Sequence, residues 1–188
     1  EAATLIPPRT TAEARELASA GPLVLELLPG PEGLSDEAAR AVVITASLIG
    51  TDAAIPILAR FRTHPSLAVR AQLTWTWHRF DSERYAADVV AHLPQDDLYF
   101  TAHSTAHLRA LHSLGGRSQL RLEGDIEPSS LRNLLPPDRT RLLILRDNHT
   151  LRDLECLSGL RRLAHLAIQA LHERLARGTL QLSRQPGQ

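Results

Sequence analysis

The chain has 188 residues, of which 43% are hydrophobic and 22% are charged, a composition typical of a globular domain with a sizeable core. Its 21 basic and 21 acidic side chains balance, so composition gives no reason to expect nucleic acid or a membrane surface as the main partner. The longest uncharged apolar run, at 41–51, is too short to span a bilayer, which takes about 20 residues.

The counts of lysine, methionine and cysteine exclude further classes of function and structure. All 21 basic residues are arginine, so the lysine of a phosphate-binding loop is absent and nucleotide hydrolysis by this segment is not expected. There is no methionine and the chain starts at Glu1, from which we expect a fragment or a processed product with any activity encoded upstream. The single cysteine, Cys156, excludes an internal disulfide and favours a reducing, cytoplasmic location.

Five helices are expected between Thr11 and Leu93, each bounded by capping or helix-breaking residues. The second, for example, begins at a cap-like Ser35 and ends at Gly50. The third tolerates Pro56 because a proline in the first turn has no hydrogen bond to lose. The five segments cover residues 11–20, 35–49, 52–62, 66–80 and 83–93.

The fourth of these segments carries one continuous apolar stripe. Its members are spaced at helical intervals, and they are Val69, Leu73, Trp77 and Phe80. Trp75 lies about 200° around the helix from Trp77, so the two indoles cannot face the same way. Trp75 is therefore either buried against the next helix pair, which we favour, or an exposed aromatic anchor for a partner.

Two of the expected helices resemble a HEAT repeat. The resemblance covers 52–80, with Pro56 in the first member of the pair and Val69-Arg70 early in the second. A HEAT unit commonly has an aspartate before its Val-Arg pair, whereas Leu67-Ala68 stands there in this chain. The resemblance implies a short all-α helical solenoid over residues 1–94.

After Pro94 the pattern changes to short Leu-x-apolar triplets. They recur at intervals of 22, 23 and 23 residues, at 98–100, 120–122, 143–145 and 166–168. A fixed period of about 20–29 residues with such strand cores is typical of leucine-rich repeats, in which each unit adds one strand and one return segment.

Residues 95–188 therefore resemble a leucine-rich-repeat horseshoe. We expect it to close with a C-terminal cap, made of a short helix at 170–177 and a last strand at 179–182. The predicted fold class is a repeat solenoid, with all-α HEAT-like helical pairs followed by an α/β leucine-rich-repeat segment.

From Leu151 to Leu166 a leucine stands at every third position, a period that fits neither a helix nor a strand. We attribute it to a turn, a return segment and a strand in succession, with every leucine pointing into the same narrow interior. Asn148, just past a predicted strand, has a side-chain amide that can satisfy backbone groups as the chain turns. The matching positions hold His103, Asp125 and Leu171, so an asparagine ladder would be incomplete.

Motifs for catalysis are missing from the sequence. It contains neither a G-x-S-x-G elbow nor an H-E-x-x-H pair, so no enzyme is predicted in this segment. His103 and His107 would lie one turn apart on a helix and could share a metal, but His112 leaves that face. The alternative is that all three are polar residues of an exposed return segment, and we expect neither a metal nor a cofactor. Cys156 is expected to be a small buried hydrophobe rather than a nucleophile.

The residues that alternate with the strand leucines would face the concave surface of the horseshoe. They are Tyr99, Thr101, Arg121, Glu123, Ile144, Arg146, Ala167 and Gln169. This mixture of aromatic, arginine, acidic and aliphatic side chains is typical of a protein-binding surface. The alternative is a merely solvated face of the sheet.

The succession of helical and leucine-rich repeats resembles the C-terminal sensor region of bacterial NACHT-type (STAND) signalling ATPases, of the actinobacterial kind. The residues that carry this resemblance are V-R-A-Q-L-T-W-T-W-H-R-F-D-S-E-R-Y-A at 69–86 and L-x-L-x-x-N-x-x-L-x-D-L-x-x-L-x-x-L from Leu143. It implies an ATP-binding domain upstream in the same chain. It also implies an autoinhibitory role for the repeats and signal transduction in innate immunity against phage.

The function expected from the sequence is therefore a module that senses a protein or peptide ligand, with no membrane partner and no nucleic acid. One alternative is a constitutive protein-binding scaffold. Another is a metal-dependent enzyme that uses His103 and His107. A nucleotide-binding domain in the parent gene would favour the sensor, whereas a short free-standing reading frame would favour the scaffold.

Overall fold

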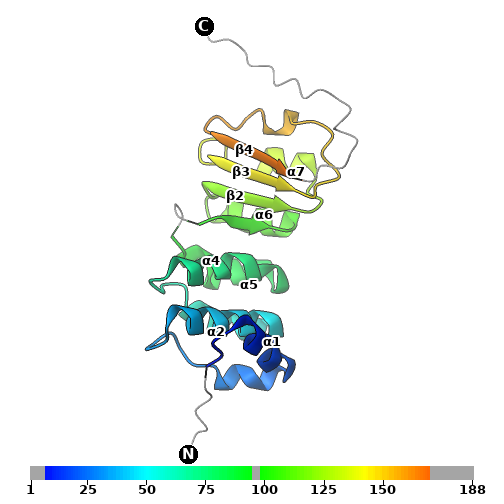
Figure 1. Ribbon diagram of the computed structural model, residues 1–188. Helices are drawn as coiled ribbons and strands as arrows, with labels where there is room; N and C mark the ends of the chain where they lie inside the picture. The colour runs from blue at the N-terminus through cyan, green and yellow to red at the C-terminus, as the bar shows by residue number, and fades with distance from the viewer. Residues whose placement is uncertain (1–6, 95–97, 170–188) are drawn as a thin grey trace, which may run out of the picture.

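The computed structural model of the protein describes residues 7–94 and 98–169, in which a stack of helices is followed by a parallel β-sheet (Figure 1). The helical stack contains α-helices of unequal length: α1 (Thr11–Ser19), α2 (Asp36–Ile49), α3 (Ile55–Arg60), α4 (Leu67–Thr76) and α5 (Ser82–Asp88). Short 3-10 turns lie between them: η1 (Pro22–Leu27), η2 (Asp52–Ala54), η3 (Trp77–Arg79) and η4 (Val90–His92).

Side-chain caps begin several of these helices. The hydroxyl of Ser35 accepts a hydrogen bond from the backbone N–H of Ala38, and α2 ends at Gly50 in a left-handed conformation with φ 67°. The carboxylate of Asp81 accepts from the N–H of Arg84 and begins α5. The helix ends predicted at Ser35 and Gly50 are therefore confirmed.

The helical stack is held by apolar packing between neighbouring helices. Helix α2 packs against α1 on one side and against α4 on the other, and α5 packs against the first helix of the sheet part. The apolar stripe predicted for 66–80 is buried, and it extends beyond α4 into η3: Val69, Leu73, Trp77 and Phe80 are all in the core. One hydrophobic core therefore runs from the helices into the sheet.

The sheet has four parallel strands in the order β1-β2-β3-β4. They are β1 (Phe100–Ala102), β2 (Gln119–Glu123), β3 (Leu142–Arg146) and β4 (His165–Gln169). The connections between them are α6 (Thr105–Ser113), α7 (Pro128–Leu134) and the 3-10 turn η5 (Glu155–Leu157). Helices α6 and α7 lie behind the sheet in the view of Figure 1.

Alternation along each strand separates the two faces of the sheet. Leu120, Leu122, Leu143 and Leu145 are buried, whereas the residues between them are partly exposed. The buried face packs against the connecting helices and turns. The leucines of the period of three join the same core, with Leu151 and Leu157 buried and the others packed against it, so that interpretation is confirmed.

The structure overturns the predicted fold class. The chain is a mixed α/β protein with a parallel sheet, and no solenoid or repeating unit is found over residues 7–94 and 98–169. The helices of the N-terminal part range from 6 to 14 residues and are separated by 3-10 turns, so they do not form a series of equal HEAT-like pairs.

The sheet part also lacks the uniformity of a leucine-rich-repeat horseshoe. Its three connections contain a helix of 9 residues, a helix of 7 residues and a 3-10 turn of 3 residues. Strands β2, β3 and β4 each contain the predicted Leu-x-apolar triplet, whereas β1 begins at Phe100, two residues later than the strand predicted at 98–100. The connecting segments, by contrast, take different structures to cover the sheet.

The predicted C-terminal cap, with its helix at 170–177 and strand at 179–182, and the ladder position Leu171 lie outside the described residues. Among the helices of 7–94 and 98–169, none combines the length and the apolar character needed to cross a membrane.

Candidate protein-binding face of the sheet

We call the side of the sheet that points away from α6 and α7 the open face. Because side chains alternate along a strand, this face is formed by the residues between the buried leucines. Its members are Tyr99, Thr101, Gln119, Arg121, Glu123, Leu142, Ile144, Arg146, His165, Ala167 and Gln169.

The strand register aligns these residues in rows across the sheet. Thr101 pairs with Arg121, Arg121 with Ile144, and Ile144 with Ala167. A second row places Glu123 beside Arg146 and Arg146 beside Gln169. Neighbours within a row lie one strand apart, a spacing of about 4.8 Å.

The helical stack contributes an aromatic side chain to the open face. Helix α4 packs against β1, and the guanidinium of Arg121 lies 4.7 Å from the centre of the Trp75 ring. Trp75 is 43% exposed, so the favoured prediction that it is buried is wrong and the alternative of an exposed aromatic residue holds. The Nε of Arg121 is buried and has no hydrogen-bond partner among the described residues.

Glu123 is the acidic centre of the open face. Its Oε2 lies 3.9 Å from the Nε of Arg121 and 3.8 Å from the Nδ1 of His103, and its Oε1 lies 3.5 Å from the Nη1 of Arg146. Arg146 also pairs with Asp147 at 3.2 Å. The carboxylate of Glu123 is thus surrounded by cationic or titratable groups, and it makes no short contact with any of the three.

Three histidines gather where the helical stack meets the sheet. The ring of His103 lies 4.8 Å from that of His78 and 6.0 Å from that of His107, measured between ring centres. Nδ1 of His107 accepts a hydrogen bond from the backbone N–H of His103 and lies 3.1 Å from the hydroxyl of Ser104. This lone pair is therefore engaged in starting α6 and is not free to bind a metal.

Burial decides the ionisation of these rings. The pKa of His107 is lowered to about 4, first by burial and then by the neighbouring His103 and His78, because like charges repel. Burial also lowers the pKa of His103, again helped by His78 and opposed by Glu123. At neutral pH both rings are uncharged.

The alternative of a metal shared by His103 and His107 finds no support in the geometry, because Nδ1 of His107 already has partners in the protein. Nδ1 of His112 points instead to the backbone oxygen of Leu134, 3.0 Å away. In the described parts of the chain, no group of three or more His, Cys, Asp or Glu side chains is placed to hold a metal ion. Cys156 is buried, which raises the pKa of its thiol and confirms its prediction as a small hydrophobe.

The structure places most of the predicted contact residues on the open face. Arg121, Glu123, Ile144 and Arg146 are partly exposed, and Tyr99 and Gln169 are exposed. Thr101 is the exception, because it is 1% exposed and lies where α4 covers β1.

Sequence reasoning did not assign Trp75, His78 or His103 to this face. Trp75 was recognised as an alternative anchor, but neither its position in the sequence nor its helical spacing shows that α4 packs on β1. The contacts of His78 and His103 likewise depend on this packing, which joins residues far apart in the chain.

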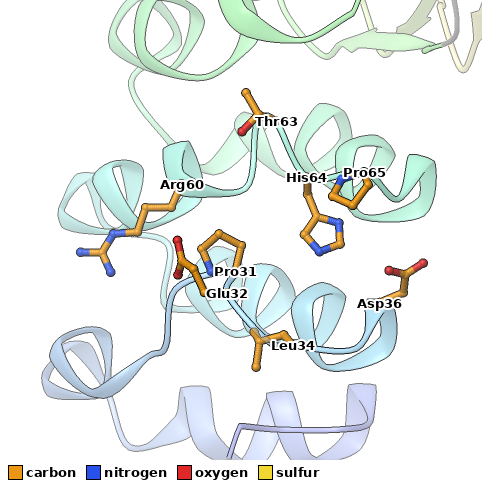
Figure 2. A pocket seen from close by; sticks show the side chains of 8 residues that line it. All are labelled: Pro31, Glu32, Leu34, Asp36, Arg60, Thr63, His64 and Pro65. Carbon is orange, nitrogen blue, oxygen red and sulfur yellow. The ribbon is translucent and has the colours of Figure 1, made fainter.

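The helical stack holds a separate hollow of about 290 Å³. Figure 2 shows it between the segment before α2 and the turn between α3 and α4, with the Arg60 guanidinium pointing away from the other labelled side chains. Its lining is Pro31, Glu32, Leu34, Asp36, Arg60, Thr63, His64 and Pro65. Nδ1 of His64 accepts from the N–H of Ser66 and so holds the turn rather than a ligand.

Comparison of the chain with protein family models, with curated proteins and with solved structures finds no match in any of the three.

Proposed function

We propose that the chain is a protein-binding module and that the open face receives a segment of its partner. The observation that carries this proposal is the stack of half-exposed Trp75 on Arg121, since tryptophan and arginine are the residues most enriched among those that dominate binding energy at interfaces. Tyr99, directly before β1, adds a second exposed aromatic ring.

The rest of the open face has the composition of an interface. Leu142, Ile144 and Ala167 form an aliphatic strip on β3 and β4, and Arg121, Glu123 and Arg146 form a charged strip beside it. An apolar centre with charged and hydrogen-bonding groups at its side is typical of surfaces that bind proteins. On a sheet face that only contacts water, a half-exposed tryptophan beside an arginine is not expected.

The proposal is tested by affinity capture from a lysate of the source organism, quantified by mass spectrometry. The full chain with Arg121→Glu and Arg146→Glu is compared with wild type and with a control variant, Arg109→Glu plus Arg132→Glu, whose arginines are exposed on α6 and α7. We expect the open-face variant to lose partners that wild type and the control retain. Equal recovery by all three would show that the open face is not the binding surface.

We further propose the role of a sensor within a larger signalling protein, a finer form of the same function that rests on the sequence resemblance alone. In a parent protein with an upstream nucleotide-binding domain, partner binding would then change the rate of nucleotide hydrolysis or exchange. An unchanged rate with intact binding would instead favour the constitutive scaffold.

A further inference from the structure

Arg121 is a cation whose hydrogen-bonding capacity is largely unused. Among residues 7–94 and 98–169 the carboxylate near it is that of Glu123, whose Oε2 lies 3.9 Å from Nε, too far for a hydrogen bond. Arg146 differs, because Asp147 lies 3.2 Å from its Nε. Of the two arginines on the open face, Arg121 is therefore the one whose guanidinium makes no short contact with a carboxylate of the described residues.

Trp75 fixes the orientation of this guanidinium. Cζ of Arg121 lies 4.7 Å from the centre of the Trp75 ring, a cation–π contact that restricts the orientation of the guanidinium. A planar guanidinium held in this way can donate two parallel hydrogen bonds to a carboxylate. Since the arginine is already stacked, less side-chain entropy is lost when a ligand binds.

Glu123 does not neutralise the site by itself. Its single negative charge is shared between Arg121, Arg146 and the neutral ring of His103, while Asp147 balances Arg146 at the end of β3. The side of Arg121 that faces the aliphatic strip has no acidic neighbour among the described residues of its row, which are Thr101, Ile144 and Ala167. A second carboxylate would therefore be attracted to that side.

The same row supplies an apolar contact at a defined distance. Ile144 lies one strand from Arg121 and Ala167 lies two strands away, so the aliphatic part begins about 5 Å and ends about 10 Å from the arginine position. In an extended peptide that crosses the strands, this separation corresponds to about one to three residues. An acidic residue followed closely by aliphatic residues fits both parts of the row.

We propose that the open face recognises an acidic-aliphatic segment of a partner protein, with an Asp or Glu carboxylate of the partner bound to Arg121 against Trp75 and an aliphatic side chain on Ile144. This inference rests on the proposed protein-binding function and names the chemistry of the partner.

The test uses short peptides and the full chain, with NMR as the readout because weak binding is expected. The probe is N-acetyl-Asp-Val-Val-amide, titrated into isotopically labelled protein while the Nε–H signals of the arginines and the indole N–H of Trp75 are followed. The matched probe is N-acetyl-Asn-Val-Val-amide, which has the same shape without the charge. A third probe carries phosphoserine in place of Asp.

We expect the Asp peptide to shift the Arg121 and Trp75 signals in a saturable manner, with about tenfold weaker binding of the Asn peptide, because a charge-assisted bidentate contact is lost. Arg121→Gln should lower the affinity for the Asp peptide by a similar factor, whereas Arg109→Gln on α6 should leave that affinity unchanged. Equal affinity for the Asp and Asn peptides, or shifts spread over all arginines, would overturn the inference. Binding of the phosphoserine peptide about tenfold more tightly than the Asp peptide would also overturn it, in favour of a phosphate site.

Failure of this inference can be told apart from failure of the proposed function. If the peptides do not discriminate but Arg121→Glu with Arg146→Glu still loses captured partners, the open face binds proteins and the carboxylate chemistry is wrong. If partner capture is unaffected as well, the open face is not an interface.

Discussion

The guanidinium of Arg117 lies 4.9 Å from the centre of the Phe100 ring, buried where the helical stack meets the sheet. Backbone oxygens take the place of a carboxylate there. Nη1 donates to Gly116 at 2.8 Å and to Leu114 at 3.3 Å, and Nη2 donates to Val90 at 3.2 Å. Burial, assisted by the charge of Arg139, lowers the pKa of Arg117 to about 10, so the side chain remains charged at neutral pH.

Arg117→Met should destabilise the protein by about 1–3 kcal/mol, because three hydrogen bonds from a charged donor are lost and the backbone oxygens they served stay buried. The gain from no longer burying a charge offsets part of this loss. Urea denaturation measures the difference, with Arg109→Met on the exposed side of α6 as the matched control. An unchanged midpoint for Arg117→Met would show that the buried guanidinium does not stabilise the junction.

Asn148 should be the most sensitive residue of the turn after β3. Its Oδ1 accepts hydrogen bonds from the backbone N–H groups of Thr150 and Leu151, each at 3.0 Å, and its Nδ2 donates to the backbone oxygen of Ile126. Asn148→Ala should cost about 2–4 kcal/mol, since both ends of a buried amide and their partners lose hydrogen bonds.

The control for that variant is Asn133→Ala, an exposed asparagine in α7. In urea denaturation, Asn148→Ala should lower the free energy of unfolding far more than Asn133→Ala. A nearly unchanged free energy for Asn148→Ala would mean that water replaces the hydrogen bonds of the amide. The role of Asn148 was predicted from its place just after the strand, and the hydrogen bonds confirm it.

Local patterns predicted the strands and the turn well because their causes are local. The Leu-x-apolar triplets at 120–122 and 143–145 lie within β2 and β3, where alternation buries every second residue. The same patterns did not determine the fold class. Equal spacing of strands says nothing about whether the segments between them form helices of similar length, and here α6, α7 and η5 differ.

The candidate site shows the same limit. Arg121 and Arg146 were placed on the open face by alternation alone, but the partner of Arg121 is Trp75, 46 positions earlier in the chain. Helical spacing shows that Trp75 and Trp77 point in different directions, but it does not show which residues each indole contacts. Only the packing of α4 on β1 decides that Trp77 is buried and that Trp75 reaches the open face.

The fluorescence of the two tryptophans should differ, because one indole is buried and the other is half-exposed. The protein with Trp75→Phe keeps only buried Trp77, whose indole N–H donates to the backbone oxygen of Thr101, and its emission should be blue-shifted and resistant to iodide quenching. The protein with Trp77→Phe keeps the half-exposed Trp75 and should be quenched readily. Trp77→Phe should also lose about 1–3 kcal/mol of stability, because it removes buried volume and this hydrogen bond.

Stability measurements by urea denaturation complete that test, with Trp75→Phe expected to lie close to wild type. Equal quenching of the two variants would contradict the orientation of α4 on β1. It would also remove the stack on Arg121 on which the binding proposal depends.

The histidines at the junction should make stability depend on mildly acidic pH. His107 has a pKa of about 4 in the folded protein against an ordinary value of 6.5, so between these values the unfolded chain binds more protons than the folded one. The free energy of unfolding should therefore fall as the pH is lowered from 6.5 towards 4, with a slope of at most ~1.4 kcal/mol per pH unit from this group. The lowered pKa of His103 acts in the same direction.

His107→Gln removes the titrating ring and should flatten this slope, although the variant itself will be less stable because the ring packs 4.5 Å from Trp77. The comparison is the change in unfolding free energy between pH 6.5 and pH 5 for wild type, for His107→Gln and for the exposed control His112→Gln. The control replaces a histidine at the exposed end of the same helix, α6. Equal slopes for wild type and His107→Gln would mean that the ring is protonated as easily in the folded protein as in the unfolded chain, and the junction would then carry no pH dependence of its own.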